Sequence, residues 1–154
     1  MEEERDFESL ASYQHALKLL QAAYRLAKEL PAFERYNLAD QLRRSALSVL
    51  LNIAEGYGRY HYLDRLRFFY IARGSLTETL SAFISAHALE YIDDEQLTWV
   101  RKTETEAEKS LNGYIAFIRK QERGSKEYGN KYMREEQAEY HITLQIPDSL
   151  VPIP

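Results

Sequence analysis

Apolar residues recur along this chain at the alternating three- and four-residue spacing of helices that bury one face. The pattern is strongest between residues 38 and 57, where the apolar stripe contains Leu42, Ala46, Val49, Ile53 and Tyr57. A proline at position 31, glycines at 56 and 58 and an acidic cluster at 93–95 interrupt the pattern where helices commonly end or begin. The chain is therefore predicted to form four helices, at about residues 8–30, 38–57, 63–91 and 95–122.

The other three helices have their own predicted core stripes. The stripe of residues 8–30 contains Leu10, Tyr13, Leu17, Leu20, Tyr24 and Ala27. Between residues 63 and 91 it contains Leu66, Phe69, Leu76, Leu80, Phe83, Ile84 and Tyr91, and between 95 and 122 it contains Leu97, Val100, Glu104, Ala107, Leu111, Tyr114, Ile115 and Ile118. Short links between four amphipathic helices predict an all-α fold, an antiparallel up-and-down four-helix bundle within residues 1–123. Asn37 and Asp64 are the predicted caps or first-turn residues of the second and third helices.

Residues 124–154 form a predicted C-terminal extension with a different pattern. The extension is first charged and rich in tyrosine, and Ile142, Leu144 and Ile146 then alternate with polar residues as in a β-strand. Because one strand is not stable alone, we expect the extension to dock elsewhere, to pair with another chain or to remain disordered.

Two leucines of the most apolar helix, Leu47 and Leu51, fall outside its core stripe. Exposed leucines on an ordered helix are best stabilised by a second apolar surface that removes them from water. We therefore predict that Leu47 and Leu51 belong to an oligomer interface. A ligand groove and inclusion in the bundle's own core are the alternatives.

Composition narrows the classes of protein to which this chain can belong. The 154 residues include no cysteine and carry a net charge of −4, which fits a single domain and excludes disulfides, thiolate metal sites and cysteine nucleophiles. No apolar run approaches the length of a membrane span, and residues 1–6 lack the features of a signal peptide. A cytoplasmic protein without a membrane partner is expected.

The side chains that commonly carry catalysis, metals or nucleotides lack the spacing that these functions need. His15, His61, His87 and His141 stand outside any Glu-x-x-His or His-Glu-x-x-His frame. Gly56-Tyr57-Gly58 is only half of a dinucleotide-binding fingerprint, and neither a P-loop nor a Gly-x-Ser-x-Gly elbow is present. We therefore expect no catalytic residues, no metal, no cofactor and no small-molecule substrate.

The basic part of the chain runs from residue 35 to residue 73, with seven basic and three acidic side chains. Its arginines alternate with tyrosines, and this combination lets guanidinium groups contact phosphates while rings stack on unpaired bases. The predicted RNA-contacting residues are Arg43, Arg44, Arg59, Arg65, Arg67 and Tyr60, with Arg73, Tyr57 and Tyr62 close in sequence. The alternative is that these arginines form ion pairs, within or between subunits, with the acidic segments 1–34 and 74–110.

Arg73 falls on the apolar stripe of residues 63–91, between Phe69 and Leu80. A buried charge without a partner is very costly, so this guanidinium must reach either solvent or a counter-ion. Glu55 is the predicted partner, and a Glu55–Arg73 pair would fix the register between the second and third helices.

The motifs of the second and third predicted helices resemble those of the 23S rRNA intervening-sequence proteins. The matching residues are Tyr36-x-Leu38, Gln41-Leu-Arg-Arg-Ser-Ala46-x-Ser48-Val49, Asn52-Ile-Ala-Glu-Gly56-x-x-Arg59, Phe68, Ile71-Ala-Arg-Gly-Ser-Leu76 and Glu78. This resemblance implies a four-helix bundle that associates into a ring, commonly a homopentamer. The family includes the accessory variability determinant of diversity-generating retroelements, which binds RNA and a reverse transcriptase. Leu50 stands where the family often has proline, which predicts a straighter second helix.

Two functions are therefore expected. The first is a non-enzymatic, homo-oligomeric scaffold that serves as an accessory factor for RNA, for a reverse transcriptase or for both. The alternative is a protein-interaction adaptor without a nucleic-acid role, whose C-terminal extension docks a partner by supplying an edge strand. The salt dependence of RNA binding separates the two, because phosphate contacts release counterions.

Overall fold

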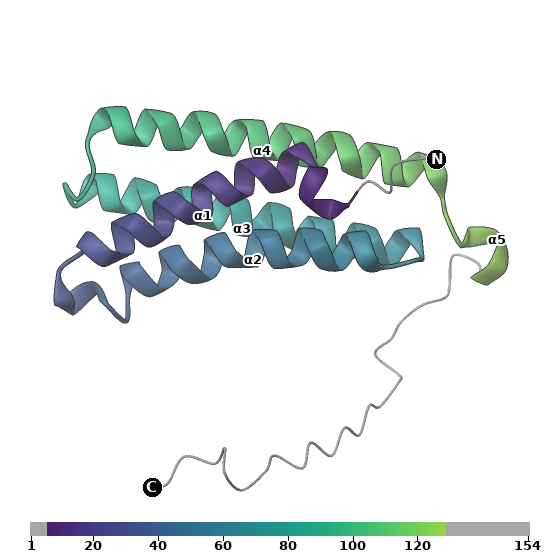
Figure 1. The fold of residues 1–154 in the computed structure, drawn as a ribbon, viewed down its shortest axis with the longest axis horizontal. Coiled ribbons are helices and arrows are strands. Elements are labelled where there is room, and N and C mark those ends of the chain that lie inside the picture. Colours follow the sequence, from purple (N-terminus) through teal and green to yellow (C-terminus); the bar gives the residue numbers. More distant parts are fainter. Residues whose placement is uncertain (1–5, 129–154) are drawn as a thin grey trace, which may run out of the picture.

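The computed structural model describes residues 6–128, and within this range it contains four long helices and no strand (Figure 1). The long helices are α1 (Ala11–Glu29), α2 (Leu38–Gly58), α3 (Tyr62–Ala88) and α4 (Asp94–Gln121). Three short helices, η1 (Phe7–Ser9), η2 (Ala32–Glu34) and α5 (Ser125–Tyr128), accompany them. The all-α prediction with four helices is thereby confirmed, whereas the strand-like pattern of Ile142, Leu144 and Ile146 lies outside the described residues.

Each long helix packs against two others: α1 against α2 and α4, and α3 against α2 and α4. The α1–α2 and α3–α4 links lie at one end of the bundle, and the α2–α3 link lies at the other (Figure 1). The face formed by α1 and α4 is therefore on the opposite side of the bundle from the face formed by α2 and α3. Within residues 6–128, no helix combines the length and the apolarity that a membrane span needs.

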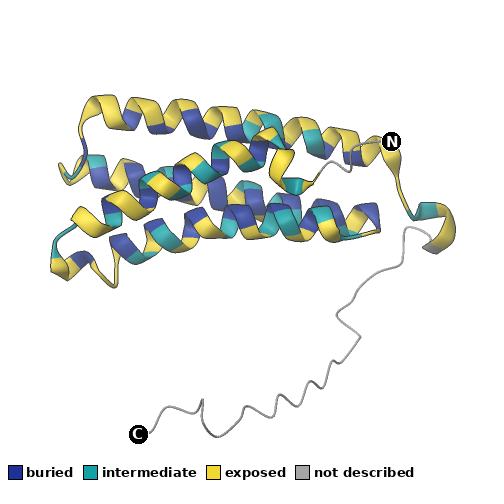
Figure 2. Cartoon of the chain, in the orientation of Figure 1, coloured by how far each residue is buried: buried dark blue, intermediate teal, exposed yellow. Residues whose placement is uncertain are grey.

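The core lies between the four long helices, whose inward faces are buried along their length (Figure 2). In α2 the predicted stripe is buried at Leu42, Ala46, Val49 and Ile53, and α3 and α4 bury most of theirs. The prediction for α1 is wrong by about one residue position. Its buried residues are Ser12, Ala16, Leu19, Ala23 and Leu26, and the predicted Tyr24 is exposed. The predicted stripe followed the bulkiest side chains of α1. In the structure, small residues lie where α1 meets its two neighbouring helices and allow close approach, and most of the predicted larger residues lie on the flanks of α1.

Helix ends are fixed by polar side chains, and the three side chains or pairs that cap the long helices are not the predicted ones. Asp93 and Gln96 form a capping box at the start of α4. At the start of α2, Asn37 makes no side-chain cap bond, contrary to expectation, and the buried Glu34 carboxylate instead accepts a bond from the Leu38 N–H at 3.3 Å. At the start of α3, His61 Nδ1 accepts from the Leu63 N–H at 3.2 Å.

Glu104 is a buried carboxylate on the core side of α4. Burial raises the pKa of the Glu104 carboxyl, and the neighbouring Glu108 carboxylate raises this pKa further. The folded state therefore holds the proton more tightly than the unfolded chain does. The stabilisation that results is complete below the pKa of a glutamate in the unfolded chain, about 4.3, and is lost as the pH rises through the raised pKa.

Replacing Glu104 by glutamine is expected to stabilise the protein at pH 7, because the substitution removes a poorly hydrated charge. The melting temperature should rise by about 2–4 °C, the shift that roughly 1 kcal/mol produces in a domain of this size. At pH 4 the gain should shrink, since the wild-type carboxyl is then largely protonated. Thermal unfolding at the two pH values measures the effect, with Glu106→Gln on the exposed side of α4 as the control. An equal gain at both pH values would show that the charge is not responsible.

Candidate nucleic-acid interface

Arg65 links the end of α2 to α4 through hydrogen bonds inside the bundle. Its side chain comes from the first turn of α3, and the residue is only 6% exposed. The Arg65 guanidinium donates to the Gly56 carbonyl oxygen at 3.1 Å and to the Tyr114 hydroxyl at 2.8 Å. Burial raises the pKa of the Tyr114 phenol, and the Arg65 charge beside it opposes that rise. Arg65 was predicted to contact RNA; the structure corrects this, because the guanidinium is enclosed and already occupied.

Arg43 and Arg44 lie near the start of α2, away from the other predicted RNA contacts. Each places a guanidinium nitrogen 3.7 Å from an oxygen of Asp40, one turn earlier on the same helix. Arg43 also donates to the Arg35 carbonyl oxygen at 3.2 Å. The structure therefore does not bring this pair together with Arg67, which is on α3.

Glu55 forms an ion pair with Arg59 at 2.6 Å, and the Arg59 guanidinium also lies 4.9 Å from the centre of the Phe68 ring. The predicted pair between Glu55 and Arg73 is wrong. Arg59 is four residues from Glu55 on the same helix, within easy reach, whereas Arg73 lies on the side of α3 that faces α4. There it donates to the Asn112 amide oxygen at 3.0 Å.

Tyr60, in the α2–α3 link, contacts the segment that follows α4. Its hydroxyl donates to both carboxylate oxygens of Glu127, at 3.0 and 2.9 Å, and the Arg123 guanidinium lies 4.4 Å from the centre of its ring. The Tyr62 N–H donates to the Arg123 carbonyl oxygen at 3.0 Å. Residues 122–128 thus pack on the α2–α3 link, and the Tyr60 ring predicted to stack on a base is in contact with the protein's own chain.

A second group of arginines surrounds Tyr70 on the face formed by α3 and α4. An open groove of about 690 Å³ lies there, and Arg67, Tyr70 and Arg119 are among its lining residues. The guanidinium groups of Arg73 and Arg119 lie 5.1 and 5.6 Å from the centre of the Tyr70 ring. Arg119 also donates to the Tyr70 hydroxyl. We call this group, Arg67, Tyr70, Arg73 and Arg119, the α3–α4 arginine cluster.

The partners of these arginines decide which positive charges are compensated. Arg59 pairs with Glu55, whereas Arg43 and Arg44 share the one carboxylate of Asp40. The hydrogen-bond partners of Arg73 and Arg119 are neutral, an amide oxygen and a phenol, and neither arginine has an ion pair with an acidic residue in the described range. Glu122 is the acidic residue that lines the groove. Two guanidinium groups that have no carboxylate partner and lie close to one aromatic ring form a site that attracts an anion.

The chain matches a protein-family model, that of the 23S rRNA-intervening sequence protein, over residues 8–113. The chain belongs to this family. It is also similar to a crystal structure of a protein of unknown function from the S23 ribosomal protein family of Bacteroides thetaiotaomicron. The TM-score is 0.62 at 24% sequence identity, and the match covers 68% of this chain and 95% of that one, which supports the fold alone. No curated protein matches the sequence.

The family match includes α1, α2, α3 and most of α4, so it contains Arg67, Tyr70 and Arg73. Arg119 and the segment that packs on Tyr60 lie beyond the matched residues. In this family member the cluster is therefore completed by a residue outside the matched region. Tyr70 and Arg119 were not predicted: Tyr70 lies inside the basic segment 35–73 without having been singled out, and Arg119 lies outside that segment.

The remaining titratable groups of the described residues do not form a metal centre. Within residues 6–128, no three histidine, aspartate or glutamate side chains come together at metal-binding distances. His61 is buried and caps α3, and His87 Nε2 lies 2.6 Å from an Asp94 oxygen. His141 lies outside the described range.

Proposed function

We propose that this member of the 23S rRNA-intervening sequence protein family is a non-enzymatic, homo-oligomeric accessory factor that binds single-stranded RNA through the α3–α4 arginine cluster. The observation that carries the proposal is the pair of guanidinium groups of Arg73 and Arg119, which have neutral hydrogen-bond partners and lie 5.1 and 5.6 Å from the centre of the Tyr70 ring. A phosphate diester would supply the ion pair that neither arginine has within the described residues.

The chemistry of the cluster suits a single strand better than a duplex. Arginine presents a planar fork of donors that fits two phosphate oxygens at once. Tyr70 is partly exposed and lines the groove beside the arginines, where an unpaired base can stack. Base stacking on an aromatic ring tolerates many sequences, and we therefore expect weak sequence preference.

Oligomerisation would increase the overall affinity of the protein for one RNA strand. We propose that the bundle has an antiparallel up-and-down topology and that subunits associate into a ring, as the family resemblance implies, commonly of five. Leu47 and Leu51 are proposed as part of the subunit contact, and both are exposed on α2. A ring repeats the cluster once per subunit, so one RNA strand can bind several clusters at high effective concentration. By the same resemblance, a reverse transcriptase of a diversity-generating retroelement is the proposed protein partner.

Salt-titrated binding of a fluorescent single-stranded RNA tests the proposal. Contact with Z phosphates should give a log–log slope of affinity against salt near −0.7Z. Replacing both Arg73 and Arg119 by glutamine is expected to make the slope shallower by about 1.4, because two phosphate contacts are lost. The matched control is Arg101→Gln with Lys102→Gln, which removes the same charge from exposed residues of α4 outside the cluster and should leave the slope unchanged.

Two outcomes would contradict the proposal. Equal slopes for the two double variants would show that RNA contacts some other surface. Absence of any salt-dependent RNA binding by the oligomer would instead favour the protein-interaction adaptor.

A further inference from the structure

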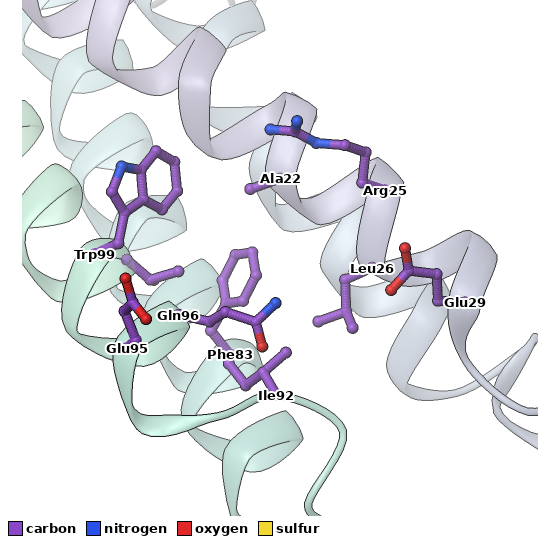
Figure 3. Close-up of a pocket in the computed structure, with 10 residues that line it drawn as sticks. Ala22, Arg25, Leu26, Glu29, Phe83, Ile92, Glu95, Gln96 and Trp99 are labelled. Atoms are coloured by element: carbon purple, nitrogen blue, oxygen red, sulfur yellow. The ribbon is translucent and has the colours of Figure 1, made fainter.

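The bundle has exposed leucines on α2 and an apolar hollow between α1 and α4. Leu51 is 60% exposed, and Leu47, one turn earlier on the same helix, is also exposed. We call Leu47 and Leu51 the apolar ridge. On the α1–α4 face there is a hollow of about 430 Å³ (Figure 3).

The hollow has an apolar floor and a mixed rim. Leu26, Phe83, Ile92 and Val100 line it and are buried. In Figure 3 Trp99 comes from the α4 side, and Ala22 comes from the α1 side. Trp99 is 41% exposed, although its ring is among the largest apolar groups of the chain. An apolar hollow walled by a half-exposed tryptophan is suited to receiving aliphatic side chains from another surface.

Charge around the ridge and the hollow is complementary. The rim of the hollow carries Glu29 and Glu95 with Arg25, an excess of one negative charge. Arg44 lies two turns before Leu51 on the same side of α2, and its side chain is 72% exposed. Arg43 and Arg44 share one carboxylate, that of Asp40, so this group has a net charge of +1. The surface that offers aliphatic side chains is thus positive, and the surface that can receive them is negative.

We propose that the hollow between α1 and α4 receives the apolar ridge of a second copy of this chain. The proposal rests on the proposed homo-oligomer and names the surface against which Leu47 and Leu51 pack. Because the two mating surfaces, the ridge on α2 and the hollow between α1 and α4, are different, the contact is head to tail. Each subunit keeps one face available for the next copy, and such contacts close into a ring when the rotation between subunits permits. The ridge is on α2 and the hollow lies between α1 and α4, so the groove of the arginine cluster on α3 and α4 belongs to neither mating surface.

Engineered cysteines test this contact directly, since the natural chain contains none. One variant carries Leu51→Cys and the other carries Ala22→Cys. After the two oligomers are mixed, exchanged and mildly oxidised, we expect cross-linked dimers in the mixture and in neither variant alone. A chain with both substitutions should give a ladder of cross-linked species that ends at the number of subunits in the ring. Ala22→Cys mixed with Ala116→Cys, at the far end of α4, is the control that should remain uncrosslinked.

A two-fold contact would give a different pattern. If the ridge packed against its own copy, Leu51→Cys would cross-link without a partner variant, and the proposal would be wrong. A stable oligomer that forms no mixed cross-link would also overturn it while leaving the proposed homo-oligomer intact. If native mass measurement found only monomer at every concentration, both the head-to-tail contact and the homo-oligomer would fail.

A charge reversal provides a second, independent measurement. Arg44→Glu should weaken self-association at least tenfold, and adding Glu95→Arg to the same chain should restore part of the loss. Trp99 is the single tryptophan of the chain, so its fluorescence reports on the hollow. On dilution its emission should shift to longer wavelength as the ridge leaves and water enters. Unchanged Trp99 emission across the dissociation measured by native mass would show that the subunits meet elsewhere.

Discussion

Replacing Arg65 by methionine is expected to lower the free energy of unfolding by about 3 kcal/mol, because two hydrogen bonds from a buried charged group are lost together. The substitution leaves the Gly56 carbonyl and the Tyr114 hydroxyl without their donor, and both belong to different helices from Arg65. For a domain of this size the melting temperature should fall by about 6–12 °C.

Arg101 on the exposed side of α4 supplies the control for this prediction. Arg101→Met removes the same charge and should change the stability by less than about 0.5 kcal/mol. Chemical denaturation of both variants measures the difference. If Arg65→Met lost no more stability than Arg101→Met, the hydrogen bonds of Arg65 would not stabilise the bundle. Arg65 would then again be a candidate for RNA contact.

Gly56→Ala is expected to destabilise the protein by about 1–3 kcal/mol, because no space is left for a side chain where α2 crosses α3. A Cβ atom at this position would lie 2.7 Å from Phe69 Cε1 and 3.1 Å from the Arg65 carbonyl oxygen. Phe69 is fully buried, and the carbonyl belongs to the backbone, so neither can move away easily.

Gly58, two residues later in the same helix, is the matched control. No heavy atom lies within 4 Å of its hypothetical Cβ, so Gly58→Ala should be neutral or stabilising by up to about 1 kcal/mol. Both substitutions restrict the unfolded chain in the same way, and the difference between their melting temperatures therefore isolates the packing contact. Equal melting temperatures would mean that α3 shifts to admit the methyl group.

Helix positions were predictable because a buried helical face needs apolar residues at a fixed period. The observed long helices begin and end within three residues of the predicted limits. The core face of α1 was displaced because periodicity counts apolar residues but does not say which of them a neighbouring helix will cover. Small residues such as Ala16 and Ala23 carry little weight in a hydrophobic pattern, yet they are the ones that permit close contact between helices.

The sequence predicted the residue types of the candidate site but not which of these residues come together. The sequence shows arginines and tyrosines in a basic segment, but the role of each arginine depends on the group that the fold brings to it. Arg65 meets a carbonyl and a phenol inside the bundle, and Arg59 meets a glutamate one turn away. Arg73 and Arg119 obtain neutral partners from helices that are distant in sequence.

The sequence alone therefore determined the all-α class, the four helices, the membership in a family of helical bundles and the exposure of Leu47 and Leu51. These follow from local periodicity and from short motifs, which do not depend on how the helices are arranged. Only the tertiary structure decided that Arg65 is buried, that Glu55 pairs with Arg59, and that Arg119 joins Arg73 around Tyr70. It also formed the hollow between α1 and α4 from residues of distant segments. The physical reason is that compensation of charge and burial of side chains are set by neighbours from other helices, and the packing of the whole bundle selects those neighbours.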